Sequence, residues 1–168
     1  LCVSGIIHGS NASINIIYSG TMSAAMEASI EGLHSIGFSL EDYAMDANFD
    51  PGTPWIRLII EQVLSNGLAD SKLLNVNIPH SSLGPIRGMK ICRQAEGRWE
   101  EEFVEGVDPR GQKFYWLTGN FATNDTVEGT DISALREGFI SIVPSSHDLT
   151  HHRAIPALKS LESIKHIV

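Results

Sequence analysis

Cysteine, basic residues and long apolar runs are scarce in this sequence. Cys2 and Cys92 lie far apart and in no CxxC or Cys/His spacing, which favours buried reduced thiols over a disulfide or a zinc site. The 12 Lys and Arg residues face 20 Asp and Glu residues, and the formal net charge of −8 argues against a protein that binds the nucleic-acid backbone. No apolar run approaches the roughly 18 residues of a membrane span, and no charged-then-apolar signal segment is visible. These absences predict a cytoplasmic protein whose partners include neither nucleic acid nor membrane.

The first 79 residues carry the pattern of an α/β core. A chain of 168 residues with 42% hydrophobic and 19% charged residues has the composition of a soluble globular domain. Short apolar runs predict strands over residues 2–6, 35–40 and 73–78, and helical spacing of apolar residues predicts helices from residue 21 to about 33 and from 54 to 67. Strand, helix, strand, helix, strand is half of a doubly wound sheet.

The rest of the chain has a different pattern. Residues 80–130 indicate an extended β-hairpin, with strands at 88–93 and 114–117 around a polar middle at 95–112. A thin hairpin needs a partner surface to bury its aromatic side chains, which are Trp99, Phe103, Phe114, Tyr115 and Trp116. Residues 131–168 predict a last strand at 139–143 and an amphipathic helix from about residue 153 to 164. One partial domain over residues 1–168 is therefore expected to divide into 1–79, 80–130 and 131–168.

Two polar, glycine-bearing segments follow the first strand. The first runs Ser4-Gly5-Ile6-Ile7-His8-Gly9-Ser10-Asn11, and the second, Tyr18-Ser19-Gly20-Thr21, opens a helix. Their hydroxyl and amide groups can donate to an anion, their glycines let backbone N–H groups approach it, and a helix N-terminus adds about half a positive charge. A phosphate fits such a site. Ser, Gly and Asn are also ordinary turn residues, so a turn without a ligand stays open.

These segments resemble the central motif of the SurE family, the survival-protein-E nucleotidases, whose pattern is Ser-Gly-Ile-Asn-x-Gly-x-Asn followed by Tyr-Ser-Gly-Thr. Further agreement comes from Asp108-Pro109-Arg110-Gly111, from Glu128-Gly129-Thr130-Asp131 and from the run between Gly138 and Pro144. The resemblance implies the C-terminal part of a three-layer, doubly wound (Rossmann-like) α/β fold with a protruding β-hairpin and a C-terminal helix. It also implies hydrolysis of nucleoside 5′- and 3′-monophosphates with Mg²⁺ or Mn²⁺ as the cofactor. The residues that it places at the phosphate are Asn11, Ser19, Gly20 and Thr21.

Two departures from the family pattern concern the metal. The family begins with a strand that ends in Asp-Asp-Gly and supplies two aspartate ligands, whereas this chain starts at Leu1, inside the middle of that fold. We therefore expect an N-terminally truncated chain whose catalytic residues are unknown. The asparagine ligand of the family pattern falls on Ile7, whose side chain has no donor atom. No intact metal site is expected, and the chain by itself is predicted to be inactive as a 5′-nucleotidase.

Three functions stay open on the sequence alone. The first is a fragment of a metal-dependent phosphatase that hydrolyses nucleoside monophosphates. The second is a non-catalytic phosphate- or nucleotide-binding module that lacks the metal site. The third is a module for oligomer assembly through the aromatic hairpin, because in the family this region and the C-terminal segment mediate oligomerisation. The resemblance implies a homodimer or homotetramer for the full-length protein.

Other residues with reactive side chains are assigned structural roles. Asp131 is expected to cap a helix or shape a turn rather than to act as a catalytic acid. His147, His151 and His152 lie close together in the sequence, but their spacing matches no metal-binding template, so solvated histidines are favoured.

Overall fold

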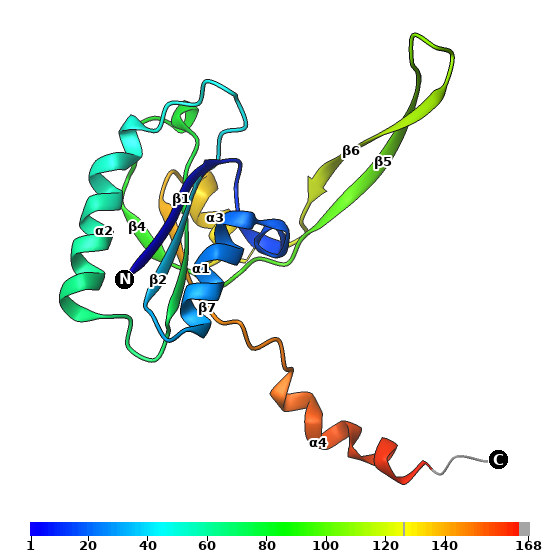
Figure 1. Cartoon of the computed structure of the whole chain (residues 1–168). Helices are drawn as coiled ribbons and strands as arrows, with labels where there is room; N and C mark the ends of the chain where they lie inside the picture. The colour runs from blue at the N-terminus through cyan, green and yellow to red at the C-terminus, as the bar shows by residue number, and fades with distance from the viewer. Residues whose placement is uncertain (126, 165–168) are drawn as a thin grey trace.

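The core of the protein is a five-stranded mixed sheet in a computed structural model that describes residues 1–125 and 127–164 (Figure 1). Its strand order is β1 (Cys2–His8), β2 (Ser35–Leu40), β3 (Leu73–Ile78), β7 (Ile140–Ser145) and β4 (Met89–Ile91). Strands β1, β2 and β3 are parallel, β7 runs antiparallel to β3, and β4 runs parallel to β7. The expected α/β fold is confirmed, and the reversed direction of β7 makes the sheet mixed.

Helices cover both faces of this sheet and form three layers (Figure 1). Helix α2 (Thr53–Asn66) places Ile59 and Val63 against the apolar face, where β2 and β3 contribute Phe38, Val76 and their neighbours. Helix α1 (Gly20–Ile30) lies on the opposite face, because Met22 packs on Gly37, which points away from Phe38 in the pleat. A Cβ at Gly37 would collide with the Met22 Sδ, so a larger residue there would force the buried Met22 side chain to shift. Helix α3 (Asp131–Arg136) packs on β7 and β3.

Short 3₁₀ helices connect or extend these elements. They cover Ser13–Tyr18, Asp50–Gly52, Ser81–Leu83, His152–Ala154 and Lys159–Ser163. The first of them carries the chain from the loop after β1 to the start of α1. Within the described part of the chain, no helix combines the length and the apolar character needed to cross a bilayer.

The β-hairpin consists of β5 (Arg98–Val107) and β6 (Lys113–Ala122), which pair antiparallel over their full length and project away from the sheet (Figure 1). The expected hairpin strand at 114–117 lies within β6, whereas the expectation of its partner strand at 88–93 is wrong in two respects. Residues Met89–Ile91 form β4 inside the main sheet, and the supposed polar middle at 95–112 contains β5. The glutamates of β5 have low strand propensity, but pairing with β6 satisfies the backbone groups of this segment whatever its side chains are.

The C-terminal segment is helical but does not form the single helix that its apolar spacing predicts. It divides into the 3₁₀ helix His152–Ala154, helix α4 (Ile155–Leu158) and the 3₁₀ helix Lys159–Ser163. The apolar side chains of this stretch are exposed, namely Ile155, Leu158, Leu161 and Ile164. A helix this short gains little stability without a packed apolar face, which accounts for its irregular geometry. Residues 165–168, the end of the expected segment, lie outside the described residues.

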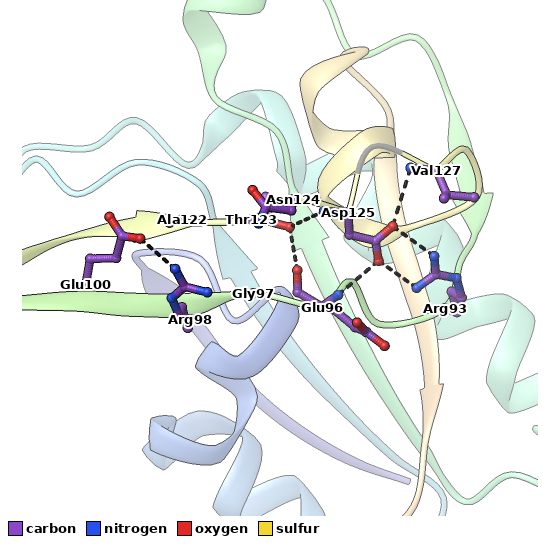
Figure 2. A pocket seen from close by; sticks show the side chains of 10 residues that line it. All are labelled: Arg93, Glu96, Gly97, Arg98, Glu100, Ala122, Thr123, Asn124, Asp125 and Val127. Atoms are coloured by element: carbon purple, nitrogen blue, oxygen red, sulfur yellow. Dashed lines mark hydrogen bonds and ion pairs between the residues drawn. The ribbon is translucent and has the colours of Figure 1, made fainter.

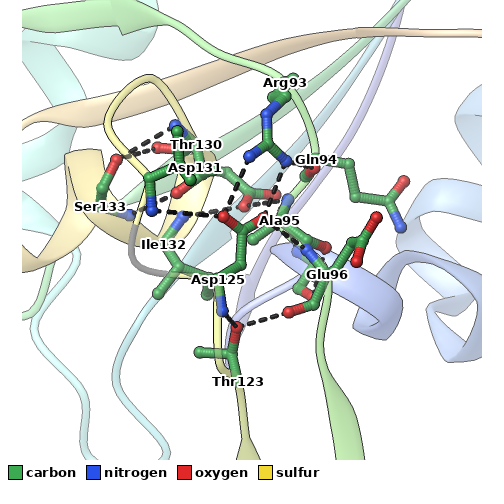
Figure 3. A network of polar contacts seen from close by, with 12 residues as sticks. Arg93, Gln94, Ala95, Glu96, Thr123, Asp125, Thr130, Asp131, Ile132 and Ser133 are labelled. Carbon is green, nitrogen blue, oxygen red and sulfur yellow. Dashed lines mark hydrogen bonds and ion pairs between the residues drawn. The ribbon is translucent and has the colours of Figure 1, made fainter.

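A buried carboxylate joins three segments that are distant in the sequence (Figure 3). Asp131 is fully buried, and its Oδ2 accepts a hydrogen bond from the Ser13 backbone N–H at 2.7 Å. Its Oδ1 accepts the backbone N–H groups of Ala95 at 2.9 Å and of Ile132 at 2.8 Å. The N-cap of α3 is Thr130, in a capping box with Ser133. Asp131 has a structural role as expected, but not as the cap, which is Thr130: its carboxylate anchors three segments at the start of α3.

Replacing Asp131 with Asn should destabilise the fold. One acceptor oxygen becomes an NH₂ group that faces backbone donors, so at least one buried N–H loses its partner, at a cost of about 1–3 kcal/mol. Urea unfolding followed by circular dichroism measures this cost, and Asp46→Asn, the same change at an exposed carboxylate, is the control. Equal unfolding midpoints for the two variants would contradict the anchoring role.

Candidate functional site

A cleft of about 670 Å³ opens between the loop after β1, the start of α1 and the base of the hairpin. Residues 7–11 and Gly20 line its polar side, and Trp99 and Leu117 line it from the hairpin. Tyr43, which follows β2, lines it as well. The cleft therefore lies at the carboxyl ends of the parallel strands β1 and β2, which is the usual ligand-binding edge of an open α/β sheet.

Asn11 is held in this cleft by its backbone, while part of its side chain stays unpaired. Its N–H donates to Asn77 Oδ1 at 2.8 Å and to Ser39 Oγ at 3.2 Å, and its carbonyl accepts from Asn75 Nδ2 at 2.8 Å. The side chain is only 6% exposed, and among the described residues no partner accepts from its Nδ2. A buried amide donor without an acceptor is unfavourable, so an acceptor oxygen that came within reach of this Nδ2 would be stabilised.

The polar face of the sheet supports this loop from below. Ser39 Oγ donates to Asn77 Oδ1 at 2.5 Å, and Asn77 Nδ2 donates to Asn75 Oδ1 at 3.1 Å. All three side chains are buried. We did not predict these residues from the sequence, although two asparagines at alternate positions of an otherwise apolar strand are a visible signal of a buried polar face.

The start of α1 contributes a second group of donors to the cleft. Ser19 is the N-cap, and its Oγ accepts the Met22 N–H at 3.0 Å. The first N–H groups of an α-helix have no partner inside the helix, and they carry the positive end of its dipole. Gly20 lines the cleft, and a Cβ built on it would meet nothing within 4 Å, so a ligand can approach the backbone there.

Three of the four residues expected at the phosphate thus lie together. Asn11, Ser19 and Gly20 line the cleft, whereas Thr21 is absent from its lining and turns its methyl group toward Gly5. The binding role of all four stays a prediction, and the position of Thr21 limits it to a contribution through its backbone.

The lining of the cleft does not fit a divalent metal ion. Ile7 faces it and is 38% exposed, at the position where the family pattern has an asparagine. Among its described lining residues there is no carboxylate, and in the described part of the chain no group of three or more His, Cys, Asp or Glu residues could hold a metal. Amides, hydroxyls and the imidazole of His8 are a poor set of ligands for Mg²⁺, which prefers carboxylates and water.

The histidines near the C-terminus are exposed, and His152 pairs with Asp148 at 2.7 Å.

A second pocket, of about 560 Å³, lies at the base of the hairpin, but four of its five charged side chains pair with one another (Figure 2). Arg93 donates to both carboxylate oxygens of Asp125, at 2.8 and 2.9 Å, and the Glu96 N–H donates to Asp125 at 3.0 Å. These hydrogen bonds lower the pKa of Asp125 to about 2, and the bond from Arg93 makes the largest contribution. We assign this pocket a structural role, because its ion pair ties the strand entering the hairpin to the segment leaving it.

The fold and the first cleft define a class, an α/β protein with a polar cleft at the carboxyl edge of its sheet. The family model described as Survival protein SurE matches residues 1–101, and the chain belongs to the SurE family. Proteins named 5′-nucleotidase SurE from Christiangramia forsetii and Flavobacterium psychrophilum are each 54% identical over 160 residues. These matches cover 95% of this chain and 62% of each relative, so the chain spans less than two thirds of their length.

The fold agrees with a solved structure of the same family. The crystal structure of the SurE protein from Aquifex aeolicus superposes with a TM-score of 0.76 at 35% sequence identity, covering 96% of this chain and 64% of that one. The hairpin and the C-terminal segment thus belong to a fold that a second, experimentally determined protein shares.

Replacing Asn11 with Asp should weaken the binding of inorganic phosphate about tenfold or more, because the shape is kept while a donor becomes a negative charge. Because the side chain is buried, the added charge should also lower the melting temperature, and the affinity is measured well below that temperature. Isothermal titration with phosphate measures the affinity. Asn48→Asp, which adds the same charge in an exposed turn, is the control for net charge. Equal affinities in both variants would contradict the role of Asn11.

Proposed function

We propose that this chain forms the phosphate- and nucleotide-binding part of a phosphatase that acts on nucleoside 5′- and 3′-monophosphates. The observation that carries the proposal is that Asn11, whose Nδ2 has no acceptor among the described residues, lines a cleft that also receives the N-terminus of α1. The relatives' name, 5′-nucleotidase SurE, supports the reaction class. Hydrolysis adds water to phosphorus and breaks the bond between phosphorus and the sugar oxygen.

The residues of this chain would bind and orient the substrate. The Asn11 amide and the first N–H groups of α1 would hold the nonbridging oxygens of the phosphate, where their fixed dipoles stabilise negative charge. Such positioning accounts for a large part of phosphoryl-transfer catalysis. Because the described lining does not fit Mg²⁺ or Mn²⁺, we assign this chain binding and orientation and no hydrolytic step.

The position of Ile7 favours a second candidate, a binding module without catalytic activity. An apolar side chain at the polar end of the cleft removes an oxygen ligand but leaves the Asn11 loop intact. Such a module would bind a nucleotide with the same affinity in the presence and absence of a divalent cation.

Self-association is a third element of the proposal. Phe103, Tyr115 and Trp116 are exposed along the hairpin, and the apolar side chains of the C-terminal segment are exposed as well. Burial of these surfaces in a second copy supports a homodimer or homotetramer of the whole protein.

The chain alone should not hydrolyse AMP with Mg²⁺ or Mn²⁺, because none of the described residues in the cleft supplies the acidic ligands that a hydrolytic metal needs. A phosphate-release assay on purified chain, with and without EDTA, measures this. Turnover above the buffer background that EDTA abolishes would show that the chain holds a working metal site.

The substitution Ile7→Asn should raise activity in a chimera that carries the N-terminal Asp-Asp-Gly strand of the family pattern. The added amide oxygen should strengthen Mn²⁺ binding about tenfold or more, if a direct ligand matters at least as much as a residue that orients one. Mn²⁺ titrations of AMP hydrolysis compare the two chimeras, and Val3→Asn, at an exposed position of the same strand, is the control. Equal midpoints and rates would show that position 7 does not face the metal.

A further inference from the structure

We propose that Trp99 and Tyr43 form the two walls that hold the nucleobase in this cleft, by contact with its faces rather than by hydrogen bonds to its edge. This inference rests on the proposed function, since a base is expected only if the ligand is a nucleotide. It assigns a role to an aromatic residue of the hairpin whose neighbours Phe103 and Trp116 lie outside the cleft lining.

Trp99 is fixed in place before any ligand arrives. Its Nε1–H donates to Asn15 Oδ1 at 2.8 Å, and its ring meets Phe121 edge to face, with centroids 5.9 Å apart and planes at 72°. The indole is 39% exposed and lines the cleft. Because its only N–H is already engaged, the ring has a π surface and no donor to offer a ligand.

Tyr43 lines the same cleft from the segment after β2, where its ring packs against Gly9. A Cβ at Gly9 would stand 3.1 Å from the Tyr43 ring, so the ring packs directly on the glycine backbone. Gly9 has a φ of +87° and donates its N–H to the Asp42 carbonyl at 2.7 Å, which fixes the loop next to Tyr43. The Tyr43 side chain is 63% exposed, a large apolar surface beside a polar loop.

The size of the cleft suits a nucleoside monophosphate, since about 670 Å³ is within the usual range for small-molecule sites. Its polar lining residues, Asn11 and the start of α1, suit the phosphate, and its aromatic lining residues suit a flat heterocycle. Stacking on aromatic side chains tolerates any base, since every base has a π face, and gains with ring area. We therefore expect purine nucleotides to bind more tightly than pyrimidine nucleotides.

The test measures binding of AMP, adenosine and ribose 5-phosphate to the 168-residue chain by isothermal titration. Wild type should bind AMP about tenfold or more tightly than ribose 5-phosphate, as expected for one stacked base. Trp99→Leu and Tyr43→Leu should each reduce that ratio and weaken adenosine binding, with ribose 5-phosphate affinity unchanged. Trp99→Phe, which keeps an aromatic face, should restore most of the ratio. Trp116→Leu, at an exposed tryptophan outside the cleft, is the matched control, and melting curves check the folding of each variant.

The outcomes separate this inference from the proposed function. Equal wild-type affinities for AMP and ribose 5-phosphate, or a ratio that survives both leucine substitutions, would overturn the aromatic walls and leave phosphate binding in place. Adenosine binding that depends on Trp99, with no binding of ribose 5-phosphate, would support the walls and overturn the phosphate site. Absence of binding by all three ligands would overturn both.

Discussion

The buried carboxylate of Asp131 is the interaction on which the arrangement of the cleft depends. It accepts hydrogen bonds from the backbone of Ser13, Ala95 and Ile132, and so joins the start of the 3₁₀ helix after β1, the segment that leads into β5 and helix α3. A buried charge is unfavourable unless hydrogen bonds replace its water, and here three backbone donors do so. The polar floor of the cleft and its hairpin wall are thus positioned by one side chain that touches neither the cleft nor a ligand.

Local patterns were sufficient to predict the first half of the fold. The expected strands at 2–6, 35–40 and 73–78 and the expected helix at 54–67 correspond to β1, β2, β3 and α2, because short apolar runs and helical spacing are determined by nearby residues. The direction of β7 and the place of β4 depend on contacts with distant strands, which a single segment does not encode. Strand β5 was missed because its glutamates suit a loop, and its pairing comes entirely from β6. The division of the chain at residues 79 and 130 stays a prediction.

The sequence predicted the cleft residues that are neighbours in the chain, but not those that come from distant strands. Residues 7–11, Ser19 and Gly20 were found because glycines and small polar residues follow a strand and open a helix. Asn75, Asn77 and Trp99 reach the same place from other strands, and their proximity follows from the tertiary fold alone. Thr21 belongs to the motif but points elsewhere, since its direction is set by the rotation of the helix.

The apolar and asparagine residues that alternate along β3 also disfavour a misaligned sheet. Its sequence Leu-Leu-Asn-Val-Asn-Ile places Val76 and Ile78 toward α2 and the two asparagines toward the loop of Asn11. If β3 shifted by one residue against β2, its side chains would exchange faces. The asparagine amides would then be buried in the apolar layer, and the loop of Asn11 would lose its hydrogen-bond partners. Both errors are unfavourable together, so the side-chain order of one buried strand also protects the chain against a misaligned sheet.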